Sequence, residues 1–560
     1  MSNALFNSIR IRPPKYNEFN LSHNVKTTIK AGVLTPFVCE PVLPGDIWNW
    51  NTEMLIRMAP FQAPVMHKCT CYTHFFFVPS RLIWDKFKEF ITGGEDGESS
   101  PPYPRLKFTK DDAESHKELF GSGSLFDYLG FPAYDSHQYQ FASGDIFVDA
   151  LPFRAYQLIF NEYYRDQNLM DEVNVMKDRS GDISAIDNQN LLYLRNRSFK
   201  KDYFTSALPF AQRGDEVTLP LVGDAKLKWK YNEFQYPPHT FAQVNGTQSN
   251  NSNMIVGPDD TSEGGVKLAD ALGLTKLNDM LTEDGKQIQL QHNKINLTDY
   301  VSKSITGVDL SNVSMATINE LRRAIKAQEF LEVAARGGSR YIEQIYSYFG
   351  VRSSDARLQR PEFLGGGKSP IVFSDVLQTS QTTESSPQAM PAGHGVSVQG
   401  EHSFSRKFEE HGYIIGIISV LPRSSYQQGM PRKFTKFDRL DYYWPQFAHL
   451  GEQEVKESEI YFSASDRYDD RLFGYVPRYA EYKFIPDTVH GDFRDSLSFW
   501  HMGRIFNNPP SLNSSFLTNV QDCFNRPFAL KETGYDLLWL NIENNVKTKR
   551  LMPKYGTPLL

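Results

Sequence analysis

The chain has 560 residues, of which 40% are hydrophobic and 13% aromatic, and its formal net charge is −6. This length can hold several ordinary domains, or one core with large insertions. The mildly acidic balance excludes a protein whose whole surface binds polyanions. The 40 phenylalanines and 28 tyrosines are typical of sandwich cores and of subunit interfaces.

The two ends of the chain are more basic than the rest. Residues 1–30 contain five basic residues and one acidic residue, and residues 541–560 contain four basic residues and one acidic residue. Such clusters can contact phosphates, although solvated termini without a partner are an equally good reading. The candidate DNA contacts are Arg10, Arg12, Lys15, Lys547, Lys549, Arg550 and Lys554.

The four cysteines are too few for a disulfide framework in a chain of this length. Cys69 and Cys71 share one face of an expected strand, but they lack a second pair at the spacing of metal ligands. We therefore expect Cys39, Cys69, Cys71 and Cys523 to be small buried side chains, and we expect no metal and no cofactor. We recognise no signal peptide or transmembrane run, so no membrane insertion is expected.

The first third of the chain mixes strands, helices and loops. Residues 1–26 read as an irregular arm, and 30–42 reads as a strand in which Pro36 and Pro41 indicate a sheet edge. A longer strand is expected at 65–78. Further expectations are a helix at 81–91, a loop at 93–104, a short strand at 146–148 and a helix at 152–167 that is buried on more than one face.

The middle of the chain changes character. Residues 215–316 are rich in polar residues and read as an exposed insertion. A helical hairpin follows at 317–350, because Thr317 and Glu320 fit a capping box and Gly337 and Gly338 fit a helix end. Residues 376–400 read as a loop.

The run 410–422 is the centre of the predicted fold. It is continuously apolar, rich in β-branched residues and ended by Pro422, so we expect a strand that is covered on both faces. Short strands are expected after it at 459–463, 478–485, 527–531 and 535–542. Together these elements favour a mainly β protein of the sandwich or jelly-roll type.

Motifs for catalysis are weak. Residues 365–369 end like a phosphate-binding loop, but Glu362 stands where the first glycine is required and Pro370 follows at once, so we expect only a flexible or tight turn. The acidic run 466–470 does not continue as a calcium loop and reads as an exposed turn. We therefore expect no catalytic residues and no enzyme activity.

Aromatic and basic residues alternate over 426–444. Such mixtures bind single-stranded nucleic acid, but the same composition describes a subunit interface. Because Asp438 and Asp441 dilute the positive charge, we favour the interface. Its expected anchors are Phe434, Phe437, Tyr442, Tyr443 and Trp444.

A series of longer motifs runs through the chain in a fixed order. They lie at 30–46, 75–84, 151–156, 165–169, 202–209, 336–341, 357–362, 410–422, 426–429, 451–453, 473–482 and 550–558. With these motifs the chain resembles the major capsid proteins of the Microviridae, small icosahedral phages with single-stranded DNA, and in particular their gokushovirus-like branch. Only 215–316 and the loop near 380–392 match poorly.

The resemblance implies one jelly-roll domain over 1–560, with eight antiparallel strands and large loop and helical insertions. It implies self-assembly into a T=1 icosahedral shell around circular single-stranded DNA, with 215–316 as the candidate surface protrusion. The implied partners are further copies of the chain, the DNA, minor pilot and scaffolding-type proteins and a host receptor. The implied location is the virion capsid, assembled in the host bacterial cytoplasm.

Two other functions remain open from the sequence. One is a carbohydrate-binding β-sandwich for surface attachment, in which exposed aromatic rings would be sugar platforms. The other is a phosphate-binding enzyme that uses Gly365–Ser369.

Overall fold

The computed structural model has two compact units, Met1–Asp215 with Glu329–Leu560 (the main unit) and Glu216–Gln328 (the second unit). The residues that it describes are 15–95, 97–134, 144–215, 217, 226–229, 241–244, 253–255, 288–290, 305–309, 317–377, 391–463, 471–529 and 535–555.

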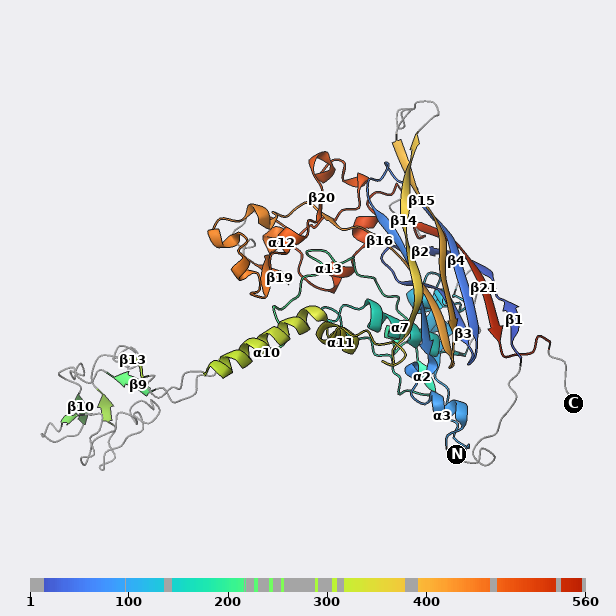
Figure 1. Ribbon diagram of the computed structural model, residues 1–560, viewed down its shortest axis with the longest axis horizontal. Coiled ribbons are helices and arrows are strands. Elements are labelled where there is room, and N and C mark those ends of the chain that lie inside the picture. The colour runs from blue at the N-terminus through green and yellow to red at the C-terminus, as the bar shows by residue number, and fades with distance from the viewer. Residues whose placement is uncertain are drawn as a thin grey trace. The chain divides into compact units, whose positions relative to one another are not determined.

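The main unit is built around a large antiparallel sheet (Figure 1). Within the described residues it has nine strands in the order β1-β21-β4-β15-β14-β5-β16-β3, with β2 also paired to β21. The predicted mainly β, antiparallel architecture is confirmed, whereas the eight-stranded jelly-roll arrangement stays a prediction. The strands are β1 (Asn17–Asn20), β2 (His23–Ile29), β3 (Thr35–Val42), β4 (Ile47–Met58), β5 (Cys69–Pro79), β14 (Glu362–Leu377), β15 (Pro391–Lys407), β16 (Gly412–Pro422) and β21 (Leu538–Arg550).

Strand β16 is the covered strand that the sequence predicts. It pairs with β5 on one side and β3 on the other, and nearly all of its residues are buried. Ile414 and Ile418 lie in one hydrophobic cluster, whereas Ile415 and Ile417 lie in a second one on the opposite face. Each buried isoleucine contributes about 1.5–3 kcal/mol to folding. Because both faces of β16 are covered by a hydrophobic cluster, apolar residues are favoured on both, and the sequence does not alternate between apolar and polar residues.

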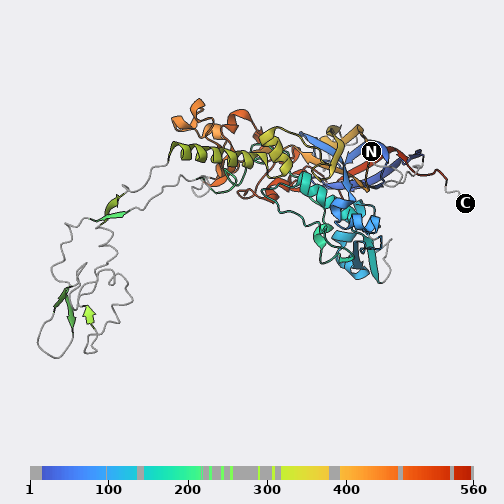
Figure 2. The same ribbon diagram turned by 60° about the horizontal axis from the view of Figure 1, so that its bottom comes forward.

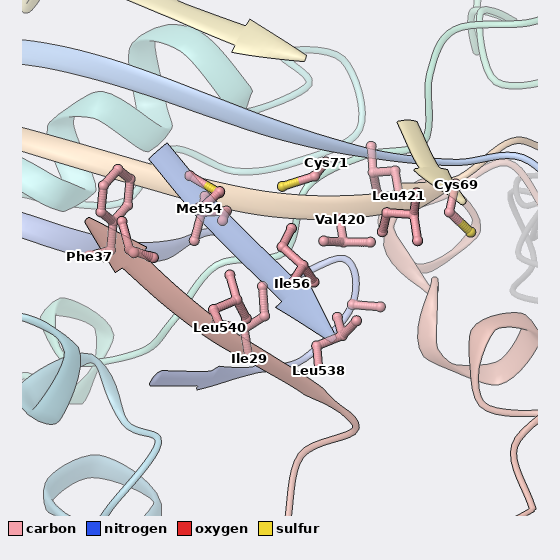
Figure 3. Packing of buried hydrophobic residues seen from close by; sticks show 14 of the residues in the cluster. Ile29, Phe37, Met54, Ile56, Cys69, Cys71, Val420, Leu421, Leu538 and Leu540 are labelled. Atoms are coloured by element: carbon pink, nitrogen blue, oxygen red, sulfur yellow. The ribbon is translucent and has the colours of Figure 1, made fainter. Parts of the chain in front are cut away.

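The inner core lies on the concave side of the sheet. Alternate residues of β4, β5 and β21 point into it, and Figure 3 shows Ile56, Cys71, Val420 and Leu540 in mutual packing. Trp48 and Trp50 are fully buried there, with stacked rings 5.7 Å apart between centroids. Cys69 and Cys71 are buried in this core, and neither forms a disulfide with another described residue.

The outer face of β16 and β5 is covered by helix α7 (Leu151–Ile159), which continues as a π-helical turn, η1 (Phe160–Tyr164). All nine residues of α7 are buried, and Tyr156 donates from its hydroxyl to the Leu34 carbonyl at 2.7 Å. This confirms the predicted helix with more than one buried face. The helices between residues 80 and 160, blue to teal in Figure 2, gather on one side of the sheet.

Shorter elements complete the main unit. A third hydrophobic cluster, around Phe204, Tyr426 and Phe473, holds the region that follows β16. The helices are α2 (Ser80–Ile83), α3 (Phe87–Thr92), α4 (Lys110–Ser115), α5 (Lys117–Phe120), α6 (Leu125–Tyr128), α11 (Tyr341–Phe349), α12 (Ala480–Lys483), α13 (Ser514–Thr518) and α14 (Gln521–Phe524), with 3₁₀ turns at η2 (Gln189–Leu191), η4 (Arg432–Phe434), η5 (Arg439–Asp441), η6 (Pro445–Phe447), η7 (Glu457–Glu459), η8 (Gly491–Arg494) and η9 (Ser498–Trp500). The short strands are β6 (Arg105–Thr109), β7 (Asp145–Asp149), β8 (Asp182–Ser184), β17 (Ser425–Tyr426), β18 (Glu452–Lys456), β19 (Leu472–Pro477) and β20 (Asp487–Thr488).

The described part of the second unit contains two small antiparallel sheets. Strand β9 (Lys226–Trp229) pairs with β13 (Ile305–Asp309), and β10 (Phe241–Val244) pairs with both β11 (Asn253–Ile255) and β12 (Ile288–Leu290). Helix α10 (Ile318–Gly337) begins at the predicted capping box, in which the Glu320 amide donates to Thr317 Oγ1 and the Thr317 amide donates to Glu320 Oε2. The two helices expected between 317 and 350 are therefore present. Among the described helices, none combines the length and apolar character that a membrane span needs.

The structure corrects several predictions in the N-terminal third. Residues 17–20 and 23–29 are not an irregular arm, because both pair with β21. The strand expected at 30–42 begins only at Thr35, because Gly32 adopts a positive φ of 77° beside Val520. The helix expected at 81–91 is two short helices, since Trp84 turns inward and donates to Ser180 Oγ at 2.8 Å.

Further corrections concern the C-terminal half. The loop expected at 376–400 includes the ends of β14 and β15, which pair with each other. The strands expected at 459–463 and 478–485 are wrong: Glu457–Glu459 is a 3₁₀ turn, and Ala480–Lys483 is a helical turn that follows Tyr479 at a φ of 60°. No strand covers the described part of 527–531. The strand expected at 535–542 is β21, which extends to Arg550.

Candidate assembly and nucleic-acid interfaces

The predicted interface segment presents its aromatic side chains to solvent. Phe437 is 89% exposed, and Phe434, Tyr442, Tyr443 and Trp444 are between 45% and 64% exposed. Three 3₁₀ turns (η4, η5 and η6) hold the segment in a compact path, and Trp444 Nε1 donates to the Arg439 carbonyl at 2.8 Å. The Trp444 indole is thus held in place, and all five rings are open to solvent.

Two of the four basic residues of the same segment, Arg432 and Lys436, are paired internally, whereas Lys433 and Arg439 are exposed. Lys436 donates to Glu481 Oε1 at 3.1 Å, and its side chain is only 6% exposed. The Lys436 ammonium also lies 3.7 Å from the centre of the Tyr482 ring. Arg432 donates to the Glu454 carbonyl and lies 3.5 Å from Glu459. These two cations are already neutralised, and the exposed carboxylates of Asp438 and Asp441 offset the charges of Lys433 and Arg439. The segment therefore offers its aromatic rings rather than a net charge, which favours a protein partner over a polyanion.

Neighbouring residues enlarge this aromatic surface, and the sequence did not predict them. Tyr482, Phe484 and Ile485 are 55%, 40% and 77% exposed, and Leu440 and Leu450 are also exposed. The rings of Tyr443, Tyr479 and Tyr482 lie within 4.9–6.3 Å of one another. Residues 478–485 were missed because a strand was expected there, and a strand would have alternated their side chains between two faces. We call Phe434, Phe437, Leu440, Tyr442, Tyr443, Trp444, Leu450, Tyr482, Phe484 and Ile485 the aromatic surface.

The basic C-terminal residues lie on a regular strand. Along β21 the side chains alternate between buried and exposed, so Lys547 and Lys549 point away from the core. In the cross-strand register Lys547 faces Asn49 of β4 and Lys549 faces Ile47 of β4. Both lysines therefore lie on the outward face of the sheet.

The other predicted DNA contacts have different surroundings. Lys15 and Lys554 are exposed, and the pairing of Asn17 with Arg550 brings the two segments to the same end of the sheet. Arg550 instead turns inward, where its Nε donates to Asp46 Oδ2 at 3.1 Å. Arg10 and Arg12 lie outside the described residues, as does the acidic run 466–470.

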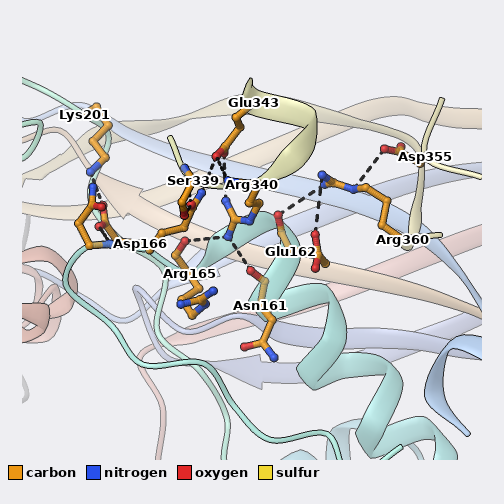
Figure 4. Close-up of polar contacts among 12 residues, drawn as sticks. Asn161, Glu162, Arg165, Asp166, Lys201, Ser339, Arg340, Glu343, Asp355 and Arg360 are labelled. Carbon is orange, nitrogen blue, oxygen red and sulfur yellow. Dashed lines mark hydrogen bonds and ion pairs between the residues drawn. The ribbon is translucent and has the colours of Figure 1, made fainter. Parts of the chain in front are cut away.

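Three of the motifs that carry the resemblance meet around the π-helical turn η1 (Figure 4). Arg340 Nη2 donates to the carbonyls of Asn161 at 2.5 Å and Arg165 at 3.1 Å. Arg360 lies 3.8 Å from Glu162 and 3.3 Å from Asp355. These contacts join residues distant in sequence, so they are suited to fixing α11 against α7.

The glycine-rich motif is not the turn that the sequence predicts. Residues 365–369 lie inside β14 and pair with β5, after a register shift between Phe363 and Gly365. A Cβ at Gly367 would lie 2.1 Å from the ring of His402, and His402 is hydrogen-bonded to Thr73. The glycine therefore serves close packing of strands, and no helix follows that could hold a phosphate.

Comparison with known proteins identifies the family of the chain. A family model described as "Capsid protein (F protein)" matches residues 10–560. The capsid protein VP1 of Bdellovibrio phage phiMH2K is 36% identical over 97% of this chain and 95% of that protein. VP1 of Chlamydia phage 1 is 32% identical over 99% and 97%, and VP1 of Spiroplasma virus 4 is 29% identical over 97% and 95%. The chain belongs to the F-protein family of phage capsid proteins, of the Microviridae type, and is a structural protein rather than an enzyme.

Proposed function

We propose that this chain is the major subunit of a T=1 icosahedral shell that encloses circular single-stranded DNA. The observation that carries the proposal is the aromatic surface, a set of uncovered rings beside two internally paired cations, Arg432 and Lys436, on a chain of the capsid family. A closed shell repeats each contact by symmetry, so one such surface is used in every copy. The occupant of the surface in this proposal is a second copy of the chain.

The DNA faces a different part of the subunit in this proposal. Lys547 and Lys549 are exposed on the outward face of β21, and Lys15 and Lys554 are exposed at the same end of the sheet. Modest positive charge suffices on an inner surface, because each repeated patch meets many phosphates. We assign Arg10 and Arg12 to the same role, and we assign Arg550 to holding Asp46.

The remaining predictions also belong to this proposal. Residues 215–316 form the surface protrusion, and minor pilot and scaffolding-type proteins and a host receptor are the further partners. Assembly takes place in the host bacterial cytoplasm. A carbohydrate-binding sandwich is not favoured, because the relatives over almost the whole chain are capsid proteins.

The proposal is tested by the DNA content of purified particles. Particles are prepared from the wild-type chain, from a Lys547→Glu, Lys549→Glu double variant and from a Lys86→Glu, Lys88→Glu control, whose lysines are exposed elsewhere. We expect the first double variant to form shells with a reduced ratio of DNA to protein, and the control to match the wild type. Equal DNA content in all three would contradict the assignment of β21 to the inner surface.

A further inference from the structure

The outward face of the sheet contains a concave site at the opposite end of β21 from the two lysines. The cavity has a volume of about 630 Å³ and is lined by residues of β2, β4 and β21 together with the loop and helix around α6. This size lies within the usual range of ligand sites, about 300–1,000 Å³. The site was not found from the sequence, because the strand expected at 535–542 had no predicted partner strands.

The floor of the site is one exposed aromatic ring between two cations. Trp539 is 38% exposed, and its Nε1 donates to the Asp536 carbonyl at 2.9 Å, which fixes the indole. In the register Trp539 faces Arg57 of β4 and Thr28 of β2, and the next outward row is Lys26, Asn541 and Leu55. Directly opposed Cβ atoms lie about 4.5–5.5 Å apart, so these side chains form one surface.

The cations of this site are available to a ligand. Lys26 and Arg57 are both exposed, and neither side chain forms a hydrogen bond or ion pair with another residue in the described part of the chain. Tyr128 of α6 forms a side wall and donates from its hydroxyl to the Thr28 carbonyl at 2.7 Å. The carboxylate of Asp127, which also lines the site, accepts from the Gly123 amide at 2.9 Å.

We infer that this site binds a nucleotide of single-stranded DNA, with the base stacked on Trp539 and a flanking phosphate held by Arg57 and Lys26. A ring face beside free cations and a side-chain amide is the combination that binds single-stranded nucleic acid with little sequence preference. Trp539 and Lys547 lie on the same face of β21, about 27 Å apart. The inference deepens the proposed function, since it places a base-binding site on the DNA-facing surface proposed above.

Two carboxylates interrupt the path between the tryptophan and the lysines. Glu543 of β21 and Glu53 of β4 face each other directly on the outward face. Phosphates are repelled there, so the strand of DNA contacts both ends of β21 more strongly than its middle. Removal of one carboxylate is therefore expected to strengthen binding.

The first test measures binding of a fluorescent oligothymidine to unassembled full-length protein at several salt concentrations. We expect Trp539→Ala to weaken binding about tenfold and Trp539→Tyr to weaken it much less, because tyrosine still stacks. Arg57→Gln with Lys26→Gln should also weaken binding and reduce its salt dependence. Glu543→Gln should strengthen it, and Lys86→Gln, a lysine on another surface, is the matched control.

The second test needs no substitution. Particles whose DNA contains 5-bromodeoxyuridine are irradiated, and the cross-linked peptides are identified after trypsin digestion. We expect a cross-link in the peptide 532–547, which contains Trp539.

Two results would overturn the site while leaving the DNA-enclosing function intact. One is that cross-links form only in other peptides, and the other is that Trp539→Ala binds the oligonucleotide as tightly as the wild type. If the wild-type chain binds no single-stranded DNA and its particles contain none, both proposals fail. A Trp539→Ala variant that binds DNA normally but does not assemble would assign this surface to a neighbouring subunit.

Discussion

The side chain of Arg550 reaches from the last residue of β21 to the buried carboxylate of Asp46, with Nε 3.1 Å from Oδ2. Asp46 also accepts from the Leu43 amide and from Trp48 Nε1, and the Arg550 guanidinium lies 5.1 Å from the Trp48 ring centre. The C-terminal strand is therefore tied to the turn before β4 by an arginine whose charge is already paired with Asp46.

We predict that Arg550→Met lowers the free energy of unfolding by about 2–3 kcal/mol, because a buried carboxylate loses its cation but keeps two other hydrogen bonds. Urea unfolding of the unassembled subunit measures this change. Lys549→Met, one residue away but exposed, should change the value by less than about 0.5 kcal/mol. Equal effects of the two substitutions would contradict the role given to Arg550.

A second prediction concerns the glycine-rich motif. Gly367→Ala forces a Cβ against the His402 ring and should destabilise the subunit by about 1–3 kcal/mol. Its neighbour Lys368 is exposed, so Lys368→Ala should be nearly neutral. The midpoints of urea unfolding compare the two. A stable Gly367→Ala variant would show that β14 can move away from His402.

A third prediction concerns acid. Burial lowers the pKa of His74 from 6.5 to about 4, with a further contribution from the positive charge of Arg197. Between these two values the unfolded chain binds a proton that the folded chain does not, so stability falls as the pH falls from 6.5 to about 4. His74→Gln can keep the hydrogen bond to the Tyr164 hydroxyl and should flatten this part of the pH profile. His449→Gln, at an exposed site, is the control, and an unchanged profile in His74→Gln would contradict the prediction.

A fourth prediction concerns the contacts around η1. Arg340→Ala removes two hydrogen bonds to backbone carbonyls, so the amides of α11 should exchange hydrogen faster while those of β16 stay protected. Arg357→Ala, at an exposed position beyond α11, is the matched control. No change in exchange for Arg340→Ala would mean that packing alone holds the helix.

The strongest sequence signals predicted the centre of the fold. These signals depend on local chemistry that tertiary contacts reinforce. They are the apolar run 410–422, the prolines of β3, and the residues that begin and end α10 and α11. The errors occur where tertiary contacts decide. The sequence of Gly365–Ser369 predicts a turn, but the segment pairs with β5 as a strand. The sequence of residues 478–485 predicts a strand, but the positive φ of Tyr479 begins a helical turn.

The candidate surfaces follow the same rule. The exposed rings at 434–444 were predicted from composition, whereas the neighbouring Tyr482 and Ile485 depend on how a distant segment packs. The alternation of apolar and polar residues along 538–550 would have indicated that Lys547 and Lys549 point outward. By the same alternation, Arg550 belongs to the opposite face of the strand. It would not have placed Arg57 and Lys26 beside Trp539, because that requires the register of three strands.

The fifth prediction tests self-assembly most directly. Phe437 is almost fully exposed, so Phe437→Asp should leave the subunit folded but place an unpaired charge in the subunit contact. Sedimentation velocity and negative-stain electron microscopy of the purified full-length chain measure the outcome. We predict closed spherical particles of uniform diameter for the wild type and slowly sedimenting, folded subunits for Phe437→Asp. A wild-type chain that stays as single copies at every concentration, or a Phe437→Asp variant that forms the same particles, would contradict the account.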